Sequence, residues 1–387
     1  MTPRIWNARL RATPFRTARQ TPAADSPRCS RLATPTRNKT RFRTATMAVA
    51  GGAMLLTLAA TGPAAAADIN LYSSRQPFLI KPMLSAFTKA SGINVNTVYI
   101  KKGLLEKIRA GGVNSPADAV LTTDMGRLDE LRQAGVLDAV QSKILSANIP
   151  AHLRNPNGLW FGLTTRARVA LVSTDRVKPG DFTSLADMAA PRFKGRICIR
   201  SGKHAYNIAL IAAQIARHGD AAAEKWLRGV KANLARKPQG NDRAQAKAVY
   251  EGVCDIAMAN NYYLGKMVTN KKKPAQQDWA KAVRLVYLDQ NGAGQHMNVS
   301  GAAIIKGTRN KAAAVKLLEF LSGDAAQKMY AEINHEYPVK AGVARSPLVR
   351  SWGAFKMDTL SIETIAKHRP AASKLVDKVG FNDGPNS

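Results

Sequence analysis

The first half of the chain alternates between short apolar runs and longer stretches in which apolar side chains recur at helical spacing. Each run of strand length ends in polar residues and is followed by an amphipathic stretch, which predicts strand–helix units and a mostly parallel sheet. Gly92 and Gly135 follow two helical stretches, where a left-handed residue commonly ends a helix. The predicted strands cover residues 68–72, 94–100 and 117–122, and the predicted helices cover residues 81–91, 104–110 and 125–134.

A second strand–helix unit follows, with predicted strands at 196–200 and 255–261 and helices at 205–218 and 262–268. Long β-rich segments separate the two units. We expect these segments to cross between two lobes, so the chain predicts an α/β fold of two hinged lobes joined by two extended crossover strands, with a ligand cleft between them. The crossing segments are 166–174, 284–288 and 298–305, and further helices are predicted at 312–321 and 325–333.

This pattern predicts a division of the chain into four parts. They are a leader at 1–67, an N-terminal lobe formed by 68–165 with 300–345, a C-terminal lobe at 166–299, and C-terminal helices at 346–387 that pack on the lobes.

The leader has the three parts of a secretory signal. A basic stretch at 37–43 precedes an apolar run at 47–60, and small residues at 65–67 come before Asp68. The apolar run is too short to span a membrane. We therefore expect cleavage after Ala67 and a periplasmic protein. The alternative for the first residues is a start of translation near Met47.

The chain is strongly basic, with a formal net charge of +32. The leader holds eleven of the basic residues and one acidic residue, so residues 68–387 retain a charge of +22. Such a charge favours anionic partners. The basic residues are spread along the chain, and Lys271–Lys273 is the only block, so nucleic acid is not expected as a partner of an exported protein.

Three tyrosines stand where predicted strands give way to helices. Tyr262 and Tyr263 follow the strand at 255–261, and Tyr206 follows the strand at 196–200. Ligands of open α/β sheets bind at the ends of strands. A phenolate is a hard oxygen anion, and ferric iron is the hard cation that needs such ligands. A single tyrosine is usually structural, but these three in an exported two-lobed chain predict a site for Fe3+.

An anion completes the predicted site. Three phenolates would neutralise the ferric charge and leave octahedral positions open, two of which a bidentate carbonate fits. A guanidinium matches a planar anion with two hydrogen bonds, and Arg75 at the end of the first predicted strand is the candidate. The Ser201–Gly202 turn before the Tyr206 helix offers backbone N–H groups as a further anion seat.

Two cysteines remain after removal of the leader, Cys198 and Cys254. Each stands at the start of a predicted strand that leads to site residues. An even number of cysteines in an oxidising compartment predicts a disulfide between them. The alternative is a pair of buried free thiols.

Short motifs along the whole exported part of the chain point to one family. The most specific is Asn260-Asn261-Tyr262-Tyr263 with Tyr206 upstream. The others are Leu71-Tyr72-Ser73-Ser74-Arg75, Pro116-Ala117-Asp118, Gly162-Leu163-Thr164, Arg166-Ala167-Arg168-Val169, Arg200-Ser201-Gly202 and Asn298-Val299-Ser300-Gly301-Ala302. Through these motifs the chain resembles the periplasmic ferric-ion-binding proteins, the substrate-binding components of bacterial iron ABC transporters.

The resemblance implies a periplasmic-binding-protein fold in which the three tyrosines bind iron. Several relatives have His-Tyr directly after the Ser-Arg of the first loop, where this chain has Gln76 and Pro77. This departure implies the branch in which three tyrosines bind iron and carbonate fills the remaining positions beside Arg75. Gln76 and Asn261 are then expected beside the metal rather than on it. The implied partners are an inner-membrane ABC permease and its ATPase, with the protein acting as a monomer.

Two other functions remain open from the sequence. The same clamp could bind a small organic or inorganic anion. An iron site is distinguished from an anion site by whether substitution of the tyrosines abolishes binding more than substitution of the arginine does. An exported enzyme is not expected, because the sequence holds no nucleophile–base set, phosphate-binding glycine loop, zinc-ligand spacing or suitably placed carboxylate pair. His204 and His296 are expected beside the site or on the surface rather than on the metal.

Overall fold

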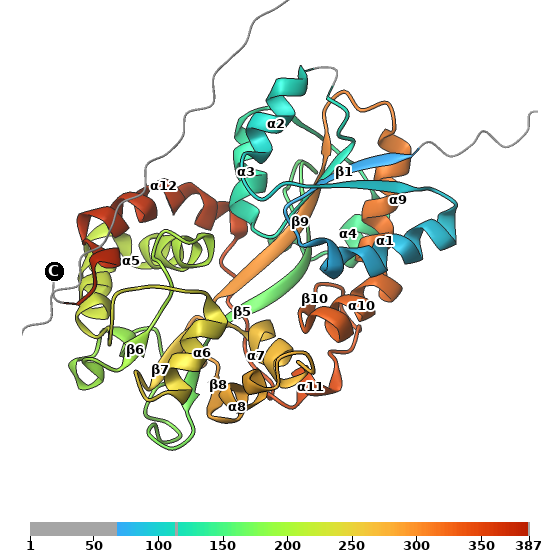
Figure 1. Cartoon of the computed structure of the whole chain (residues 1–387). Coiled ribbons are helices and arrows are strands. Elements are labelled where there is room, and N and C mark those ends of the chain that lie inside the picture. Colours follow the sequence, from blue (N-terminus) through green and yellow to red (C-terminus); the bar gives the residue numbers. More distant parts are fainter. Residues whose placement is uncertain (1–67, 113–114, 386–387) are drawn as a thin grey trace, which may run out of the picture. The chain divides into compact units, whose positions relative to one another are not determined.

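The computed structural model describes residues 68–112 and 115–385, which form strands of a connected sheet system flanked by helices (Figure 1). The predicted leader and its cleavage site after Ala67 fall outside the described residues. The hydrogen-bonded strand order is β2-β1-β3-β9-β5-β7-β6, and three short strands pair beside this path. Within the described residues, the predicted α/β class and division into two lobes are confirmed.

The N-terminal lobe begins with strand–helix units in chain order: β1 (Ile69–Ser73), α1 (Pro77–Ser91), β2 (Val95–Tyr99), α2 (Leu104–Gly111), β3 (Ala119–Thr122) and α3 (Met125–Gln133). Strand β1 lies between β2 and β3 and is parallel to both, as the alternating pattern predicted. Helix α1 begins four residues earlier than expected. Pro77 occupies its first position, where the missing N–H of proline leaves no helical hydrogen bond unmade.

Two long antiparallel strands, β5 (Phe161–Ser173) and β9 (Met297–Ile305), extend from one lobe towards the other (Figure 1). Strand β9 pairs with β3 on one side and with the first half of β5 on the other. From Arg168 onward, β5 pairs instead with β7 (Ile256–Asn260) and β8 (Val283–Val286). Every residue of β5 and β9 is buried, including the polar side chains of Thr164, Arg166 and Arg168 in β5.

The C-terminal lobe adds one short strand and four helices: β6 (Ile197–Cys198), α5 (Ala205–Ala232), α6 (Asp242–Tyr250), α7 (Asn261–Val268) and α8 (Ala275–Lys281). Strand β6 is parallel to β7. Helix α5 continues beyond the predicted residues 205–218, but it bends at Gly219, whose φ of 79° is not helical. The predicted helix is therefore the first of two helical segments that meet at a kink.

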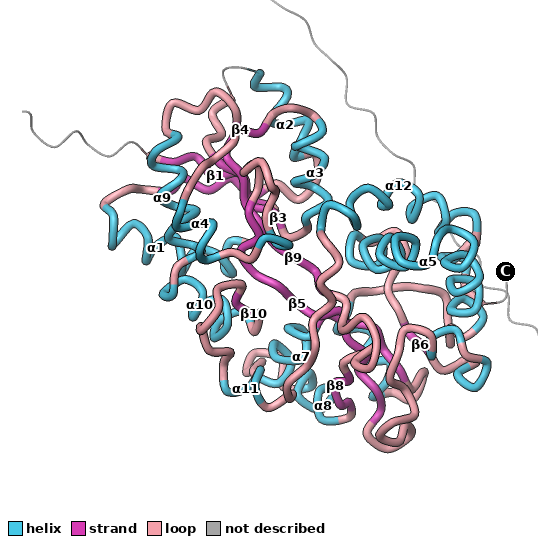
Figure 2. The backbone as a smooth tube through the Cα atoms, turned by 180° about the vertical axis from the view of Figure 1, so that it is seen from behind, coloured by secondary structure: helices cyan, strands magenta, loops and turns pink. Residues whose placement is uncertain are grey.

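The remaining elements cover the lobes. They are β4 (Leu137–Asp138), α4 (Lys143–Asn148), α9 (Lys311–Ser322), α10 (Asp324–Asn334), β10 (Tyr337–Pro338), α11 (Pro347–Arg350) and α12 (Ile362–Lys378), with 3-10 turns at Ala151–Leu153, Asp187–Ala189, Pro191–Phe193 and Phe381–Asp383. Helix α12 packs along α5 and also contacts α3, so it touches both lobes (Figure 2). The boundaries predicted between the four parts of the chain stay a prediction.

Each lobe has its own hydrophobic core. One cluster lies around β1, β3 and the first half of β5, and two clusters lie on opposite faces of β7 and the second half of β5. Along β7, Ile256 and Met258 enter one cluster while Ala257 and Ala259 enter the other. Successive side chains of a strand point to opposite faces, so β7 is a central strand covered on both sides.

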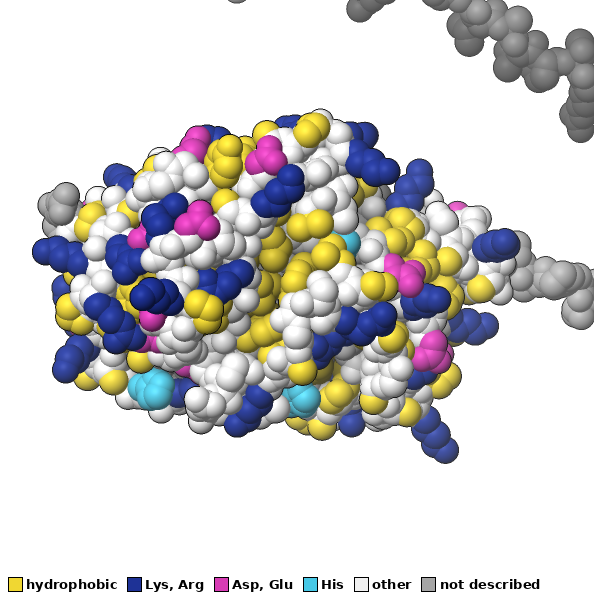
Figure 3. All heavy atoms as spheres, turned by 90° about the horizontal axis from the view of Figure 1, so that it is seen from below, with side chains coloured by type: hydrophobic (Ala, Val, Ile, Leu, Met, Phe, Trp, Pro, Cys, Tyr) yellow, Lys and Arg dark blue, Asp and Glu magenta, His cyan; other side chains and the backbone are white. Residues whose placement is uncertain are grey.

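The surface carries the charge expected from the sequence. On the face in Figure 3, Lys and Arg side chains are spread over the whole area and are more prominent than Asp and Glu. The block Lys271–Lys273 is exposed in a loop, as predicted for solvated charges. Among residues 68–112 and 115–385, no helix is long and apolar enough to cross a membrane.

Candidate functional site

Two of the three predicted tyrosines meet in the C-terminal lobe. Tyr206 lies in the first turn of α5 and Tyr262 in the first turn of α7, and their phenol oxygens are 3.2 Å apart. The two helices follow β6 and β7, which are parallel neighbours. Helices that follow parallel strands begin at the same edge of a sheet, which explains why these tyrosines converge.

The third tyrosine lies beside this pair. The ring of Tyr263 packs against the ring of Tyr262, with centroids 4.3 Å apart. The guanidinium of Arg243 lies over the Tyr263 ring, 5.5 Å from its centroid. All three phenols therefore lie in one region that is partly shielded from solvent.

Burial favours the protonated phenols of Tyr262 and Tyr263. Burial, with a smaller contribution from the Tyr206 phenol, raises the pKa of Tyr262 well above its usual value near 10. Burial also raises the pKa of Tyr263 to about 12. A hard cation that binds here must displace these protons, as bound metals do from other weak acids.

Arginines surround the Tyr206 ring. The guanidinium carbons of Arg166, Arg168 and Arg200 lie 5.7, 6.0 and 5.5 Å from its centroid. Arg168 and Arg200 are paired with the fully buried carboxylate of Asp242, at 2.7 and 3.0 Å. This carboxylate also accepts the backbone N–H of Asn260, 2.9 Å away, and so fixes the strand end that leads into the tyrosine pair.

Arg75 lies at the site, but its guanidinium is already engaged. Its two terminal nitrogens donate to the Glu336 carboxylate at 3.0 and 3.1 Å, and one of them also donates to Ser300 at 2.6 Å. The side chain is buried, and only Nε lacks a partner among the described residues. Burial acts to lower the pKa of Arg75, but the Glu336 carboxylate together with Tyr330 and Tyr262 raises it overall. The two terminal guanidinium nitrogens that were expected to bind an anion therefore bind a carboxylate of the protein.

A small pocket joins Arg75 to the tyrosines. Its volume is about 30 Å³, room for a small ion or a water molecule. Sequence reasoning did not identify three of the groups that line it, Arg166, Lys266 and Glu336. For Arg166 there was a signal, because two arginines at alternate positions of an apolar strand must share one face. The pocket is lined by Arg75, Leu79, Thr123, Arg166, Tyr206, Tyr262, Lys266, Asn334 and Glu336.

The Ser201–Gly202 turn differs from the expected anion seat. The backbone N–H of Gly202 donates to the Asn382 side chain at 2.8 Å, so it is not free. A side chain at Gly202 would clash with Phe381 and Val376, because the C-terminal segment packs directly on the turn. The glycine is thus required for packing, and its predicted role in binding an anion is not supported.

Asn261 and Gln76 have different environments. Asn261 is fully buried, accepts the backbone N–H of Ala167 at 2.9 Å and donates to the backbone oxygen of His335 at 3.0 Å. It thereby fixes the start of α7 between β5 and the segment after α10. Gln76 is exposed and donates to the Tyr99 hydroxyl at 3.0 Å. The structure therefore places Asn261 directly behind the tyrosine pair and Gln76 at a surface position.

The histidines do not form a metal cluster. Within the described residues, no group of three or more His, Cys, Asp or Glu side chains could hold a metal ion. His204 caps α5 through its Nδ1, and burial lowers its pKa to about 3. His296 is buried and lines other pockets rather than the pocket at the tyrosines. Tyrosine oxygens are thus the candidate ligands that the described part of the chain brings together.

The expected disulfide is present. Cys198 and Cys254 are joined, with their Cα atoms 6.0 Å apart. Cys198 ends β6 and Cys254 lies two residues before β7, so the bond links the segments that lead to Tyr206 and Tyr262.

The two-lobed α/β fold with a polar pocket between strand ends defines a ligand-binding protein. The sequence model for bacterial extracellular solute-binding proteins matches residues 69–332, and the chain belongs to this family. It is similar to iron uptake protein A1 of Synechocystis sp., with 41% identity over 315 residues that cover 81% of this chain and 87% of that protein.

Solved structures agree with this assignment. Apo ferric ion-binding protein A of Pasteurella haemolytica is 49% identical, with a TM-score of 0.77 over 82% of this chain and 98% of that one. A Trichodesmium protein (IdiA, FutA) in complex with iron and citrate is 42% identical, with a TM-score of 0.78 over 81% and 99%. These relatives are named as transport and binding proteins, and the chain is a solute-binding protein rather than an enzyme.

Proposed function

We propose that this protein binds ferric iron in the periplasm and delivers it to an iron-importing ABC transporter. The observation that carries the proposal is the 3.2 Å approach of the Tyr206 and Tyr262 phenol oxygens, with Tyr263 packed beside them. The relatives support it, because they are named as iron-uptake and ferric-binding proteins and share 41% to 49% of their aligned residues with this chain.

Tyr206, Tyr262 and Tyr263 supply all the protein ligands in this proposal. Each binds as a phenolate, so ferric iron enters with loss of one proton from each tyrosine, and three phenolates balance its charge. The arginines around Tyr206 would stabilise the negative phenolate oxygens electrostatically. Asn261 and Asp242 position the tyrosine helix through its backbone and do not touch the metal.

A synergistic anion fills the remaining positions, and we take carbonate as that anion. The Glu336 carboxylate in the ligand-free protein has the planar shape and charge expected of it, and it occupies the guanidinium of Arg75. Carbonate would compete with Glu336 for this guanidinium, with Arg166 beside it in the pocket. Citrate is the rival anion, because it accompanies iron in the Trichodesmium structure.

Binding couples to closure of the lobes in this proposal. Arg75 and Glu336 belong to the N-terminal lobe, and Tyr206 and Tyr262 belong to the C-terminal lobe. A ligand that contacts both sides stabilises the closed arrangement. The closed surface is what an inner-membrane permease, driven by its ATPase, would recognise, and the protein would act as a periplasmic monomer after signal cleavage.

The visible spectrum tests the proposal. Phenolate-to-ferric charge transfer should colour the iron-loaded protein orange to red, and Tyr262→Phe should shift or abolish the band. A protein that holds stoichiometric iron without colour would exclude tyrosine ligation. A protein that takes up no iron but binds a small organic anion would support the alternative function of the clamp.

A further inference from the structure

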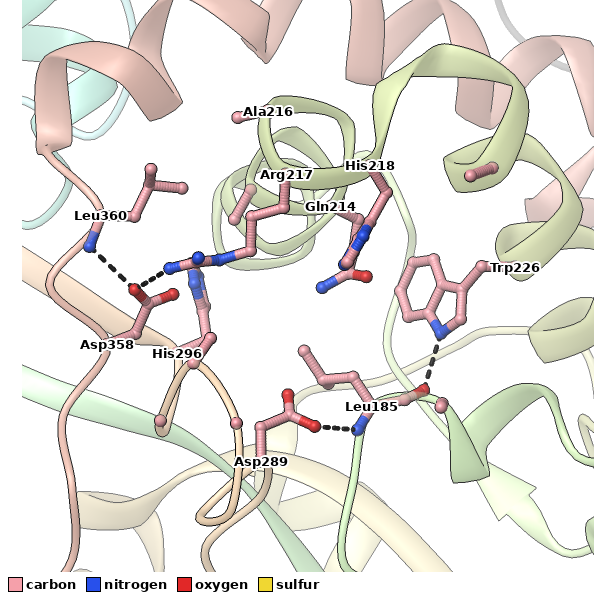
Figure 4. Close-up of a pocket in the computed structure, with 16 residues that line it drawn as sticks. Leu185, Gln214, Ala216, Arg217, His218, Trp226, Asp289, His296, Asp358 and Leu360 are labelled. Atoms are coloured by element: carbon pink, nitrogen blue, oxygen red, sulfur yellow. Dashed lines mark hydrogen bonds and ion pairs between the residues drawn. The ribbon is translucent and has the colours of Figure 1, made fainter.

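A second cavity lies in the C-terminal lobe, away from the tyrosines. Its volume is about 660 Å³, and none of its lining residues takes part in the tyrosine site. It opens to the surface and is lined by α5 on both sides of its kink, by Leu185 and Ala186, by the loop 289–296 and by the segment 358–360 before α12 (Figure 4). Cavities of this size accommodate small organic molecules.

Two polar side chains at this cavity lack hydrogen-bond partners within the described residues. His296 is 2% exposed, and neither of its ring nitrogens is paired. Gln214 is 9% exposed, and its amide makes no hydrogen bond with the described residues. The His296 nitrogens are closed off from solvent and therefore from the cavity, whereas the Gln214 amide is not among the fully buried groups and can pair with a ligand there. Both groups border the space in Figure 4.

The unpaired groups present donors and acceptors together. The Gln214 amide offers N–H donors and an acceptor oxygen, and the Asp289 carboxylate offers acceptors. A hydroxyl group can donate and accept at once, and is the simplest ligand group that satisfies such pairs.

The full charges at the cavity largely cancel. Arg217 forms an ion pair with Asp358, which also accepts the backbone N–H of Leu360 at 2.8 Å. The remaining acid is Asp289, whose carboxylate accepts the backbone N–H of Leu185 at 3.1 Å. One carboxylate with a free acceptor oxygen suits a hydroxyl donor, and because Arg217 is already paired the cavity does not favour an anion.

The opposite side of the cavity is apolar. In Figure 4, Trp226 lies across the space from His296 and Arg217. Its Nε1 is already satisfied by the backbone oxygen of Leu185 at 2.7 Å, so the indole offers the cavity only apolar surface. An aromatic face opposite hydrogen-bonding groups fits a ring molecule with an apolar face and a polar rim.

The wall that carries His296 is fixed by buried hydrogen bonds. The fully buried Gln295 donates to the backbone oxygens of Arg168 and His296 at 2.7 and 3.1 Å, and accepts the backbone N–H of Leu288 at 2.8 Å. Its backbone N–H donates to the Lys356 oxygen at 2.9 Å. A site whose wall is already ordered loses little conformational freedom when a ligand binds.

We propose that this cavity is a binding site for a neutral, hydroxyl-rich ring molecule of the size of a monosaccharide. Its hydroxyls would pair with Gln214 and Asp289, and its apolar face would lie on Trp226. The site is separate from the iron site, so it gives the protein a second ligand that does not depend on iron.

The test is a binding titration of the mature, iron-free protein with D-glucose, D-galactose and D-mannose. Choline and succinate serve as the cationic and anionic rivals. Intrinsic fluorescence reports on Trp226 together with the other tryptophans, and saturation-transfer NMR detects the bound sugar directly. At least one hexose should bind saturably. Gln214→Ala should weaken this binding about three- to tenfold, the effect of one lost neutral hydrogen bond.

Gln239→Ala is the matched control, because Gln239 is exposed and lies outside the cavity. It should leave hexose binding unchanged, and neither variant should alter iron loading. Three outcomes would overturn the proposal. They are the absence of saturable hexose binding at hexose concentrations well above the millimolar range, binding of choline or succinate alone, and hexose binding that Gln214→Ala does not weaken. A melting curve of each variant confirms that it is folded.

Discussion

The phenol oxygens of Tyr206 and Tyr262 lie 3.2 Å apart although 56 positions separate the residues in the chain. The disulfide between Cys198 and Cys254 spans the same 56 positions and joins the strands that lead to these two tyrosines. Strand pairing, the disulfide and the helix starts thus all place the same two segments side by side. The tyrosine pair is the product of this local architecture.

The first prediction concerns the three tyrosines. Tyr262→Phe keeps the ring that packs on Tyr263 but removes the oxygen, so the fold should persist while iron affinity falls. We expect a loss of at least about 100-fold, because altering groups that merely support metal ligands already costs up to that factor. Tyr206→Phe and Tyr263→Phe should behave alike. Competition with a chelator measures the affinity.

Tyr250→Phe is the matched control, because Tyr250 is 51% exposed and away from the site. It should bind iron as the unaltered protein does. If Tyr262→Phe and Tyr250→Phe retain equal affinity, tyrosine ligation at this site is wrong.

The second prediction is acid sensitivity of iron binding. The pKa of Tyr262 lies well above 10 and that of Tyr263 is about 12, so both are protonated in the iron-free protein at neutral pH. Iron binding must release these protons, and affinity therefore rises with pH and falls on acidification throughout the neutral range. Proton release measured by pH-stat titration should fall by one proton in Tyr263→Phe. Binding without proton uptake or release would contradict phenolate ligation.

The third prediction is a loss of folding stability in mild acid. Burial lowers the pKa of His335 to about 4 in the folded protein, against about 6.5 when unfolded. Between these values the unfolded state binds more protons, so stability is complete above pH 6.5 and falls as pH drops towards 4. His335 contributes a slope of the free energy of unfolding against pH that approaches about 1.4 kcal/mol per pH unit. His335→Asn keeps a side chain that tolerates its φ of 57° and should flatten the slope.

The exposed His218 provides the control for this slope. Denaturant unfolding of His218→Asn at a series of pH values should match the unaltered protein. Equal slopes for His335→Asn and His218→Asn would show that His335 is accessible to protons in the folded state.

The sequence predicts the fold because its signals are local. Apolar runs such as that of β7 are bounded by polar residues, and alternate residues face two cores, which single-sequence pattern can capture. The helices α6 and α8 were missed since their apolar faces are short and rich in alanine and glutamine. The predicted start of helix α1 falls too late, because proline breaks a helical pattern in the interior of a helix but is compatible with its first position, which Pro77 occupies.

The site is predictable only in part, because local sequence patterns do not reveal contacts between distant segments. The tyrosines could be found because they follow strands directly, so their convergence depends on neighbouring segments alone. The partner of Arg75 lies 261 positions away, and no local pattern indicates that Glu336 would occupy its guanidinium. The Ser201–Gly202 turn likewise meets Asn382, 180 positions distant. Long-range polar contacts depend on how the two lobes are assembled, which residue spacing does not record.

The fourth prediction concerns the disulfide. Replacing both Cys198 and Cys254 by Ala should lower the free energy of unfolding by roughly 4 kcal/mol, since the bond closes a loop with a sequence separation of 56. Iron affinity should fall less than in the tyrosine variants, because strand pairing still holds the segments. Denaturant unfolding measures the first effect. Reduction of the unaltered protein should reproduce it, and two free thiols in the denatured, unreduced protein would disprove the bond.

The last prediction tests the anion through Glu336. Arg75→Ala alone would leave a buried carboxylate without its partner and destabilise the protein, so it cannot separate binding from folding. Glu336→Gln keeps the shape of the side chain but removes the charge that holds the Arg75 guanidinium. Carbonate would then compete with a weaker partner for the Arg75 guanidinium. We expect bicarbonate to enhance iron affinity at roughly tenfold lower concentration, the effect of one weakened charged hydrogen bond.

The experiment loads bicarbonate-depleted protein with ferric iron, adds bicarbonate, and follows the visible band and the affinity. Glu332→Gln is the control, since Glu332 lies in the same helical region but is exposed. If bicarbonate strengthens iron binding equally in the unaltered protein and in Glu336→Gln, the anion lies elsewhere, with Arg166 the next candidate. If bicarbonate has no effect in either protein while citrate does, citrate takes the place proposed for carbonate. If neither anion changes the affinity, iron has a further protein ligand and the anion proposal is wrong.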